Sequence, residues 1–83
     1  MSKEQILTGW NYRVIKHDEA ENPYFAMHEV YYDEIGEIEG WTIESVNPEG
    51  DTSEELSQDL DFMIYDAKNH PVLLWSELEK TVP

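Results

Sequence analysis

Cysteine is absent from this 83-residue sequence, which excludes disulfide frameworks, thiol nucleophiles and every Cys-based zinc or iron–sulfur site. Long apolar runs are also absent. Nothing approaches the roughly 20 residues of a membrane span, and the first residues contain no apolar stretch long enough for a signal peptide. The absence of cysteine fits a reducing compartment, and we expect a cytoplasmic protein with no membrane partner.

Basic residues are scarce, since five Lys and Arg stand against nineteen Asp and Glu and give a formal net charge of -14. A surface this acidic repels phosphate backbones and anionic lipid, so direct binding to nucleic acid is not expected. The chain is also short, and a domain of this size buries only about 60% of the surface that its unfolded form exposes. Because little room remains for an internal active-site cavity, we expect the function to lie on the surface.

Apolar residues make up 40% of the chain and aromatic residues 12%, which is too rich for a disordered acidic tail. The chain is therefore expected to fold. Residues 1–9 show no sustained periodicity and predict a flexible N-terminal arm, while residues 10–83 predict a single domain.

Three strands are predicted in the first half of this domain. A period of two predicts strands over residues 10–17 and 24–33, separated by a polar loop that ends in Asn22-Pro23. Asp33 and Gly36 predict a tight hairpin turn. A third strand is expected over residues 37–46, where Gly40 allows a bulge.

One helix is predicted in the second half, where Thr52 and Glu55 form a capping box after a turn. An apolar stripe at helical spacing is expected to pack against the sheet: Leu56, Leu60, Met63, Ile64 and Ala67. Acidic residues are expected to face water: Glu54, Asp59, Asp61 and Asp66. Asn69 and Pro71 end the helix before a short apolar run over residues 72–75.

This order of elements predicts an α+β fold. We expect a three-stranded antiparallel meander packed by one helix, with a short C-terminal strand or extended segment. Such a layout leaves one sheet face and one sheet edge open, and these are natural contact surfaces in a small protein.

Four segments carry a resemblance to known proteins: Trp10-Asn11-Tyr12-Arg13-Val14, His28-Glu29-Val30-Tyr31-Tyr32-Asp33, Trp41-Thr42, and Gly50-Asp51-Thr52 with Glu54-Glu55-Leu56. Through them the sequence resembles a group of small bacterial proteins with a tyrosine-rich hairpin ahead of one acidic helix, a group with no assigned activity. More distantly, it is similar to the N-terminal partner-binding domain of HicB-type antitoxins. That similarity implies the capping of a toxin that acts on RNA, although residues 43–48 replace the Pro-Asp-Leu-Pro-Gly stretch usual in the family.

Catalytic patterns are weak in this sequence. His17, His28 and His70 supply the imidazoles, and no Gly-rich phosphate loop, nucleophile elbow or HExxH element is present. His17 and His28 could meet across the first two strands and form a divalent metal site with Glu29 or Asp18, but a third ligand at diagnostic spacing is missing. We therefore expect no enzyme activity, no cofactor and no bound metal, and keep the two-histidine metal site as a minor alternative.

Acidic and aromatic side chains carry the leading functional hypothesis, which is binding to a basic protein. The partner could be a nucleic-acid-acting enzyme that is inhibited, as by an antitoxin or a phage anti-defence protein. The predicted anchors are aromatic: Tyr31, Tyr32 and Trp41. The predicted charges lie on the hairpin and the helix: Asp33, Glu34, Glu37, Glu39, Glu54, Glu55, Asp59, Asp61 and Asp66. The alternative is a homo-oligomer, such as a homodimer, whose copies pair through the aromatic sheet face. In that case the negative charge serves solubility alone.

Overall fold

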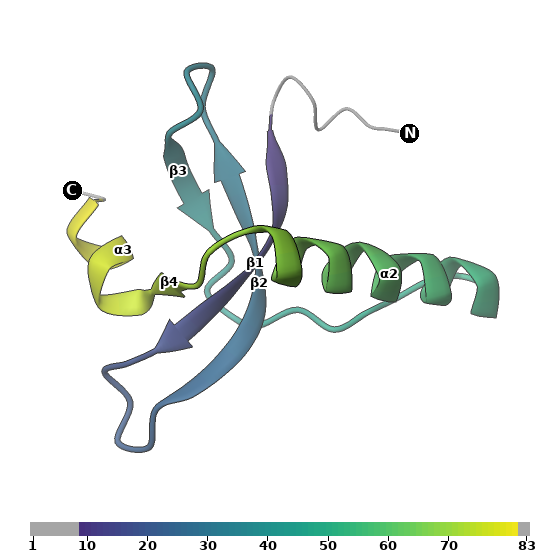
Figure 1. Ribbon diagram of the computed structural model, residues 1–83, viewed down its shortest axis with the longest axis horizontal. Coiled ribbons are helices and arrows are strands. Elements are labelled where there is room, and N and C mark those ends of the chain that lie inside the picture. The colour runs from purple at the N-terminus through teal and green to yellow at the C-terminus, as the bar shows by residue number, and fades with distance from the viewer. Residues whose placement is uncertain (1–8, 82–83) are drawn as a thin grey trace.

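The computed structural model describes residues 9–81 and has the predicted α+β fold (Figure 1). Its elements are β1 (Trp10–His17), β2 (Tyr24–Tyr32), β3 (Ile38–Trp41), α2 (Ser53–Asn69), β4 (Leu73–Leu74) and α3 (Trp75–Thr81). The antiparallel meander, the helix and the short C-terminal strand are confirmed. The predicted arm falls mostly outside the described residues, but Gly9 is held in place because Tyr32 N donates to its carbonyl at 2.9 Å.

The four strands form one curled sheet in the order β3-β2-β1-β4. β1 and β2 pair antiparallel along their whole length, from Trp10 opposite Tyr31 to His17 opposite Tyr24. β4 adds two residues in parallel to the other edge of β1, with Leu73 opposite Ile15. The C-terminal segment therefore completes the sheet beside its first strand.

The turn between β2 and β3 follows its predicted chemistry. Gly36 has a φ of 88°, a value that glycine adopts without strain, and its N–H donates to the Asp33 carbonyl at 3.0 Å. The Asp33 carboxylate accepts from the backbone N–H groups of Ile35 and Glu37. A bulge is present beside Gly40, because Tyr31 lies opposite Gly40 and Tyr32 opposite Ile38, which leaves Glu39 as the extra residue.

The third strand is shorter than the predicted span of residues 37–46. Regular pairing ends at Trp41, yet Thr42 N donates to the Glu29 carbonyl and Val46 N to the Met27 carbonyl. The segment after β3 thus stays beside β2 without forming a continuous ladder, because only some of its amides reach the neighbouring strand.

The apolar core lies between the sheet and α3. Ile15, Val30 and Leu78 are its buried centre. Partly buried side chains surround them: Tyr32, Ile38, Trp41, Leu73 and Trp75. A seven-residue helix therefore closes the core, which the sequence predicted only as one possible final turn.

α2 lies against the opposite face of β1. Successive side chains of a strand point to opposite faces, and α2 contacts Tyr12 whereas α3 packs on Ile15. Figure 1 shows α2 crossing the sheet and extending well beyond it. None of the helices within residues 9–81 has the length and apolar character needed to cross a membrane.

The prediction that the apolar stripe of α2 packs against the sheet holds only in part. Met63 is buried and Ala67 is half-buried, while Leu56, Leu60 and Ile64 are 37%, 41% and 52% exposed. The physical reason is that the first turns of α2 lie beyond the strands (Figure 1). Asp59 and Asp66, which were expected to face water, instead accept hydrogen bonds from the Tyr12 hydroxyl and backbone N–H.

Candidate functional site

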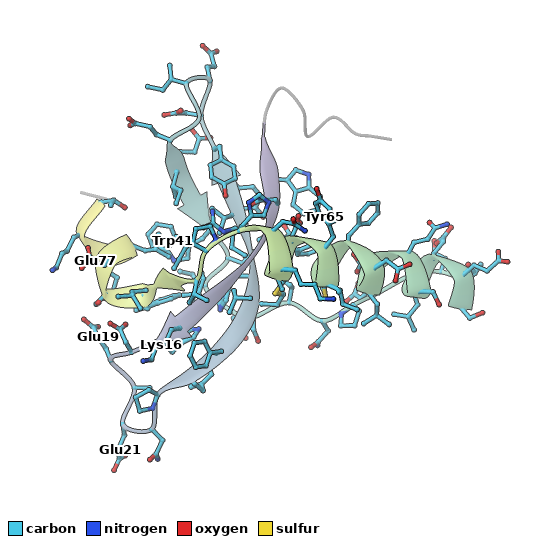
Figure 2. All side chains as sticks on the ribbon, viewed as in Figure 1. Lys16, Glu19, Glu21, Trp41, Tyr65 and Glu77 are labelled. Carbon is cyan, nitrogen blue, oxygen red and sulfur yellow. The ribbon has the colours of Figure 1, made fainter. Side chains whose placement is uncertain are left out.

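The predicted aromatic anchors divide into one exposed ring and two inward rings. Tyr31 is exposed, and its hydroxyl donates to Glu29, a bond that raises the pKa of Tyr31 to about 12. Tyr32 and Trp41 pack against the core cluster, and Figure 2 shows Trp41 on the side of the sheet nearest α3. Tyr31 is therefore the accessible one of the three.

The hairpin acids also divide by role. Glu34, Glu37 and Glu39 are exposed, whereas the carboxylate of Asp33 is occupied by the turn that it caps. Glu19, Glu21 and Glu77 are also exposed, and Figure 2 shows them pointing away from the ribbon. These side chains contribute charge without shaping the backbone.

On α2, the five predicted acids have different environments. Thr52 Oγ1 accepts from Glu55 N at 3.1 Å, which confirms the N-cap, and Glu55 Oε1 reaches back to Asp51 N at 2.9 Å. Glu54 and Asp61 are exposed, and neither takes part in a hydrogen bond from a side chain among residues 9–81. Asp59 and Asp66 are partly buried and turn toward β1.

Two carboxylates of α2 accept hydrogen bonds from Tyr12. Its hydroxyl donates to Asp59 Oδ1, and its backbone N donates to Asp66 Oδ2 at 3.0 Å. Asp59 Oδ2 also accepts from Glu49 N at 2.9 Å. Burial and the hydrogen bond to Asp59 raise the pKa of Tyr12, and the charges of Asp59, Glu29 and Asp66 raise it further. The electrostatic environment between β1 and α2 is therefore negative.

A cleft lies between β1 and α2 at this position, and we call it the β1–α2 cleft. Its apolar lining consists of four aromatic rings: Trp10, Tyr12, Phe62 and Tyr65. Asp59, Asp61 and Asp66 also line it. Trp10 and Tyr12 meet edge to face with ring centroids 5.2 Å apart, which fixes one wall. Phe62 and Tyr65 form the other wall and are 59% and 62% exposed.

Trp10, Phe62 and Tyr65 were not among the residues predicted for this site. A signal was present in the helix, because Phe62 and Tyr65 are three residues apart and lie between Asp59 and Asp66. Their proximity to Trp10 depends on where α2 crosses β1, and nothing in the local sequence specifies that crossing.

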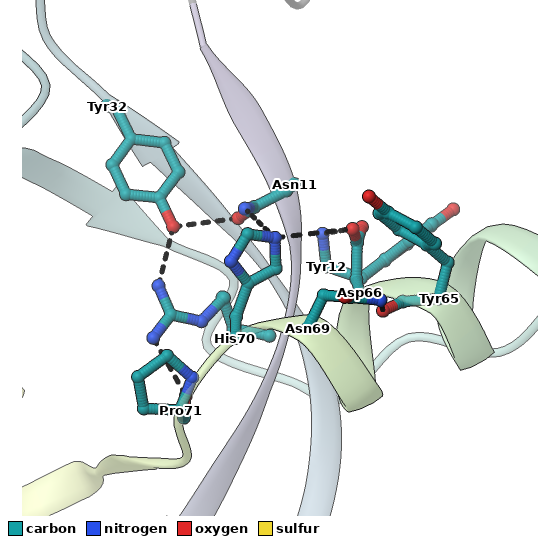
Figure 3. A network of polar contacts seen from close by, with 9 residues as sticks. Asn11, Tyr12, Tyr32, Tyr65, Asp66, Asn69, His70 and Pro71 are labelled. Carbon is teal, nitrogen blue, oxygen red and sulfur yellow. Dashed lines mark hydrogen bonds and ion pairs between the residues drawn. The ribbon is translucent and has the colours of Figure 1, made fainter.

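A network of neutral acceptors holds the buried Arg13 on the other face of β1 (Figure 3). Arg13 Nη1 donates to the Tyr32 hydroxyl and Nη2 to the Pro71 carbonyl, both at 2.8 Å. The Tyr32 hydroxyl donates in turn to Asn11 Oδ1, and Asn11 Nδ2 lies 3.4 Å from His70 Nε2. Among the described residues, no carboxylate pairs with this guanidinium, so its charge serves to join β1, β2 and the segment before β4.

His17 and His28 meet, but their geometry suits a hydrogen bond. Their Nε2 atoms are 2.9 Å apart, and His28 Nδ1 lies 2.9 Å from the Thr42 carbonyl. That carbonyl requires a proton on His28 Nδ1, so His28 Nε2 is the acceptor for His17 Nε2–H. His17 is also stacked between Tyr24 and Trp75, with ring centroids 4.4 and 4.8 Å away.

Burial lowers the pKa of His28, so its imidazole is held neutral. Residues 9–81 contain no group of three or more His, Asp or Glu side chains placed to hold a metal ion. The histidine pair thus joins β1, β2 and α3 as part of the aromatic packing.

Charge pairing is sparse within residues 9–81. Lys80 and Glu77 form an ion pair at 3.9 Å, and His70 Nε2 lies 3.6 Å from Asp66 Oδ1, a contact that is an ion pair only with a protonated imidazole. The other described carboxylates form no ion pair with a residue in this range. A partner that brings positive charge would therefore meet carboxylates that the protein has not neutralised itself.

Comparisons with protein-family models, with curated proteins and with solved structures find no match for this chain. A functional proposal therefore depends on the chemistry of the residues.

Proposed function

We propose that this protein is a non-enzymatic binding module whose acidic surface engages a basic protein. One observation carries the proposal. α2 extends beyond the sheet and exposes the apolar side chains of Leu56, Leu60 and Ile64, which we call the α2 stripe, beside unpaired carboxylates. Apolar surface left open on an ordered element typically marks an interaction site.

The chemistry of the surface determines the class of partner. A helix with exposed leucines and isoleucine offers contact area, and the surrounding acids attract positive charge over several ångströms. Basic grooves that bind nucleic acid have the complementary charge. We infer that a nucleic-acid-acting protein is the partner class and that binding masks its basic surface, as an antitoxin or an anti-defence protein would.

Affinity capture tests the proposal with a matched pair of variants. The test variant carries Glu54→Gln and Asp61→Asn on α2, and the control carries Glu34→Gln and Glu37→Gln on the hairpin. All four side chains are exposed, so both variants lose the same charge without touching the core. We expect one basic protein, identified by mass spectrometry, to bind the natural chain and the control, to bind the α2 variant weakly, and to elute with added salt.

Capture that is insensitive to salt and equal for both variants would contradict the proposal. The recovered partner should also lose its nucleic-acid binding when mixed with the purified protein. Retained nucleic-acid binding by the partner in that mixture would rule out masking.

The α2 stripe also favours a second candidate function, which is self-association. A homodimer through α2 replaces the predicted aromatic sheet-face dimer, because Tyr32 and Trp41 are packed in the core. The two candidates respond to salt in opposite directions. Salt weakens binding to a basic partner but screens the repulsion between two copies of net charge -14. Sedimentation at low and raised salt separates them, since only a homodimer would strengthen.

A further inference from the structure

We propose that the β1–α2 cleft binds an arginine side chain of the basic partner. This inference rests on the proposed function and adds the group that is recognised. The cleft combines aromatic walls with carboxylates, and a guanidinium is the protein side chain that fits both, because it stacks on rings and donates to carboxylates.

The walls of the cleft offer ring surface on two sides. Trp10 and Tyr12 are fixed by their edge-to-face contact, and Phe62 and Tyr65 project from α2 with most of their surface exposed. Figure 3 shows Tyr65 and Asp66 on the part of α2 nearest Tyr12. A planar cation entering here would exchange water for ring contacts that are already in place, so little ordering entropy would be lost.

The carboxylates have acceptor capacity left for such a cation. Asp61 accepts no hydrogen bond from a side chain within residues 9–81. Asp66 uses Oδ2 for Tyr12 N, while its Oδ1 accepts no hydrogen bond from the part of the chain that the structure describes and lies 3.6 Å from His70 Nε2. Each oxygen of Asp59 already accepts one hydrogen bond, from the Tyr12 hydroxyl and from Glu49 N, so we assign to it the contribution of charge.

Lysine fits the cleft less well than arginine. Its ammonium is a compact, strongly hydrated charge that loses more hydration against aromatic walls, and it has no planar face to stack on them. Selectivity for arginine over lysine at equal charge therefore separates binding in the cleft from general attraction to an acidic surface.

The test uses the full-length protein and two probes of equal length and charge. One is an acetylated, amidated peptide of alternating arginine and glycine, and the other replaces each arginine with lysine. Titration is followed by NMR, through the indole N–H of Trp10 and the rings of Phe62 and Tyr65. We expect the arginine peptide to bind about fivefold more tightly and to shift these signals at saturation.

Variants localise the binding. Phe62→Ala combined with Tyr65→Ala leaves the charge unchanged and should weaken the arginine peptide about tenfold. Phe25→Ala is the control, because Phe25 is a similarly exposed aromatic residue, 61% exposed, on β2 and outside the cleft. Asp61→Asn and Glu54→Gln each remove one negative charge from α2. We expect the dissociation constant of the arginine peptide to be about threefold higher for Asp61→Asn than for Glu54→Gln. This single substitution keeps the inference testable if the double variant does not fold.

Equal affinity for the two peptides, or no effect of the ring substitutions in a folded variant, would overturn the inference. The proposed function fails separately. One result would support the proposed function and contradict the inference about the cleft. In that result, the captured partner is lost with the Glu54→Gln and Asp61→Asn variant but is still bound by the Phe62→Ala and Tyr65→Ala variant.

Discussion

The two helices of this protein contrast in what they contribute to it. α3 has seven residues and closes the core with Leu78 and Trp75, whereas α2 has seventeen residues and buries Met63. Contact between α2 and β1 includes the hydrogen bonds of Asp59 and Asp66, while Leu56, Leu60 and Ile64 remain exposed. The comparison teaches that the short helix closes the core, whereas the long helix leaves much of its apolar surface open.

Truncation of one leucine on each helix tests this contrast most strongly. Leu78 is 3% exposed, so Leu78→Ala should lower the free energy of unfolding by about 2–5 kcal/mol through lost burial and a residual cavity. Leu60→Ala removes the same atoms from an exposed site and should cost about 1 kcal/mol or less. Chemical denaturation monitored by tryptophan fluorescence measures both. Equal losses would mean that α2 carries as much of the core as α3.

The pH dependence of the unfolding free energy tests the contribution of the buried His28 to stability. Its folded-state pKa lies below the ordinary value of 6.5, because burial disfavours the charged imidazole. Below pH 6.5 the unfolded chain takes up a proton that the folded chain resists, so the stability from neutral His28 is complete above pH 6.5 and is lost as the pH falls toward the folded pKa.

The expected loss is at most about 1.4 kcal/mol per pH unit in that window. The groups facing His28 are His17 and Arg13 on β1, the Thr42 carbonyl and Trp75 on α3, and the charge of His17 adds to the lowering of the His28 pKa. Denaturation at about pH 7.5 and about pH 5.5 measures the slope. His28→Gln should flatten it, and an unchanged slope in that variant would assign the acid sensitivity to other groups.

A smaller effect is expected from the polar contact between α2 and β1. Tyr12→Phe removes the hydroxyl that donates to Asp59, while Asp59 keeps its bond from Glu49 N. We expect a loss of about 1 kcal/mol in unfolding free energy. Tyr31→Phe is the matched control, since its hydroxyl also donates to a carboxylate but on an exposed surface. Equal losses of unfolding free energy for Tyr12→Phe and Tyr31→Phe would show that the bond to Asp59 contributes no more than an exposed one.

The smallest effect is expected at the start of α2. Thr52→Ala removes the N-cap acceptor and should cost about 0.5 kcal/mol in helix stability, since the cap is exposed. Because the N-terminal half of α2 extends past the sheet, the loss should appear as faster amide exchange over residues 56–60 with little change in β1. A drop in global stability as large as that of Leu78→Ala would show that the start of α2 is coupled to the core.

Local features of the fold could be predicted from the sequence because short-range chemistry determines them. The Thr52 cap and the turn at Asp33 and Gly36 depend on residues within a few positions of one another. The position at which α2 crosses β1 could not be predicted in this way, since the donors that Asp59 and Asp66 meet belong to Tyr12, far away in the chain. An apolar stripe indicates a helix, but it does not indicate whether the stripe meets the same chain or another one.

The candidate site shows the same division. Exposed acids such as Glu54 and Asp61 could be selected from composition and spacing alone. Trp41 could not be recognised as a core residue, because its burial depends on Trp75 arriving from the C-terminal segment, with ring centroids 6.2 Å apart. The β1–α2 cleft exists only where the strand and the helix cross, so its aromatic walls have no signature in either segment alone.

The acidic residues that accept backbone hydrogen bonds set a limit on redesign of this molecule. A protein engineer who wished to reverse its surface charge could replace most exposed glutamates with lysine, because those side chains hold nothing in place. Replacement would cost stability where a carboxylate accepts a hydrogen bond from a main-chain N–H, because the lysine side chain has no acceptor. Those fixed positions are Asp18, Asp33, Glu55, Asp59 and Asp66. A recharged version of this fold would therefore remain acidic along its turns, its helix cap and the contact between β1 and α2.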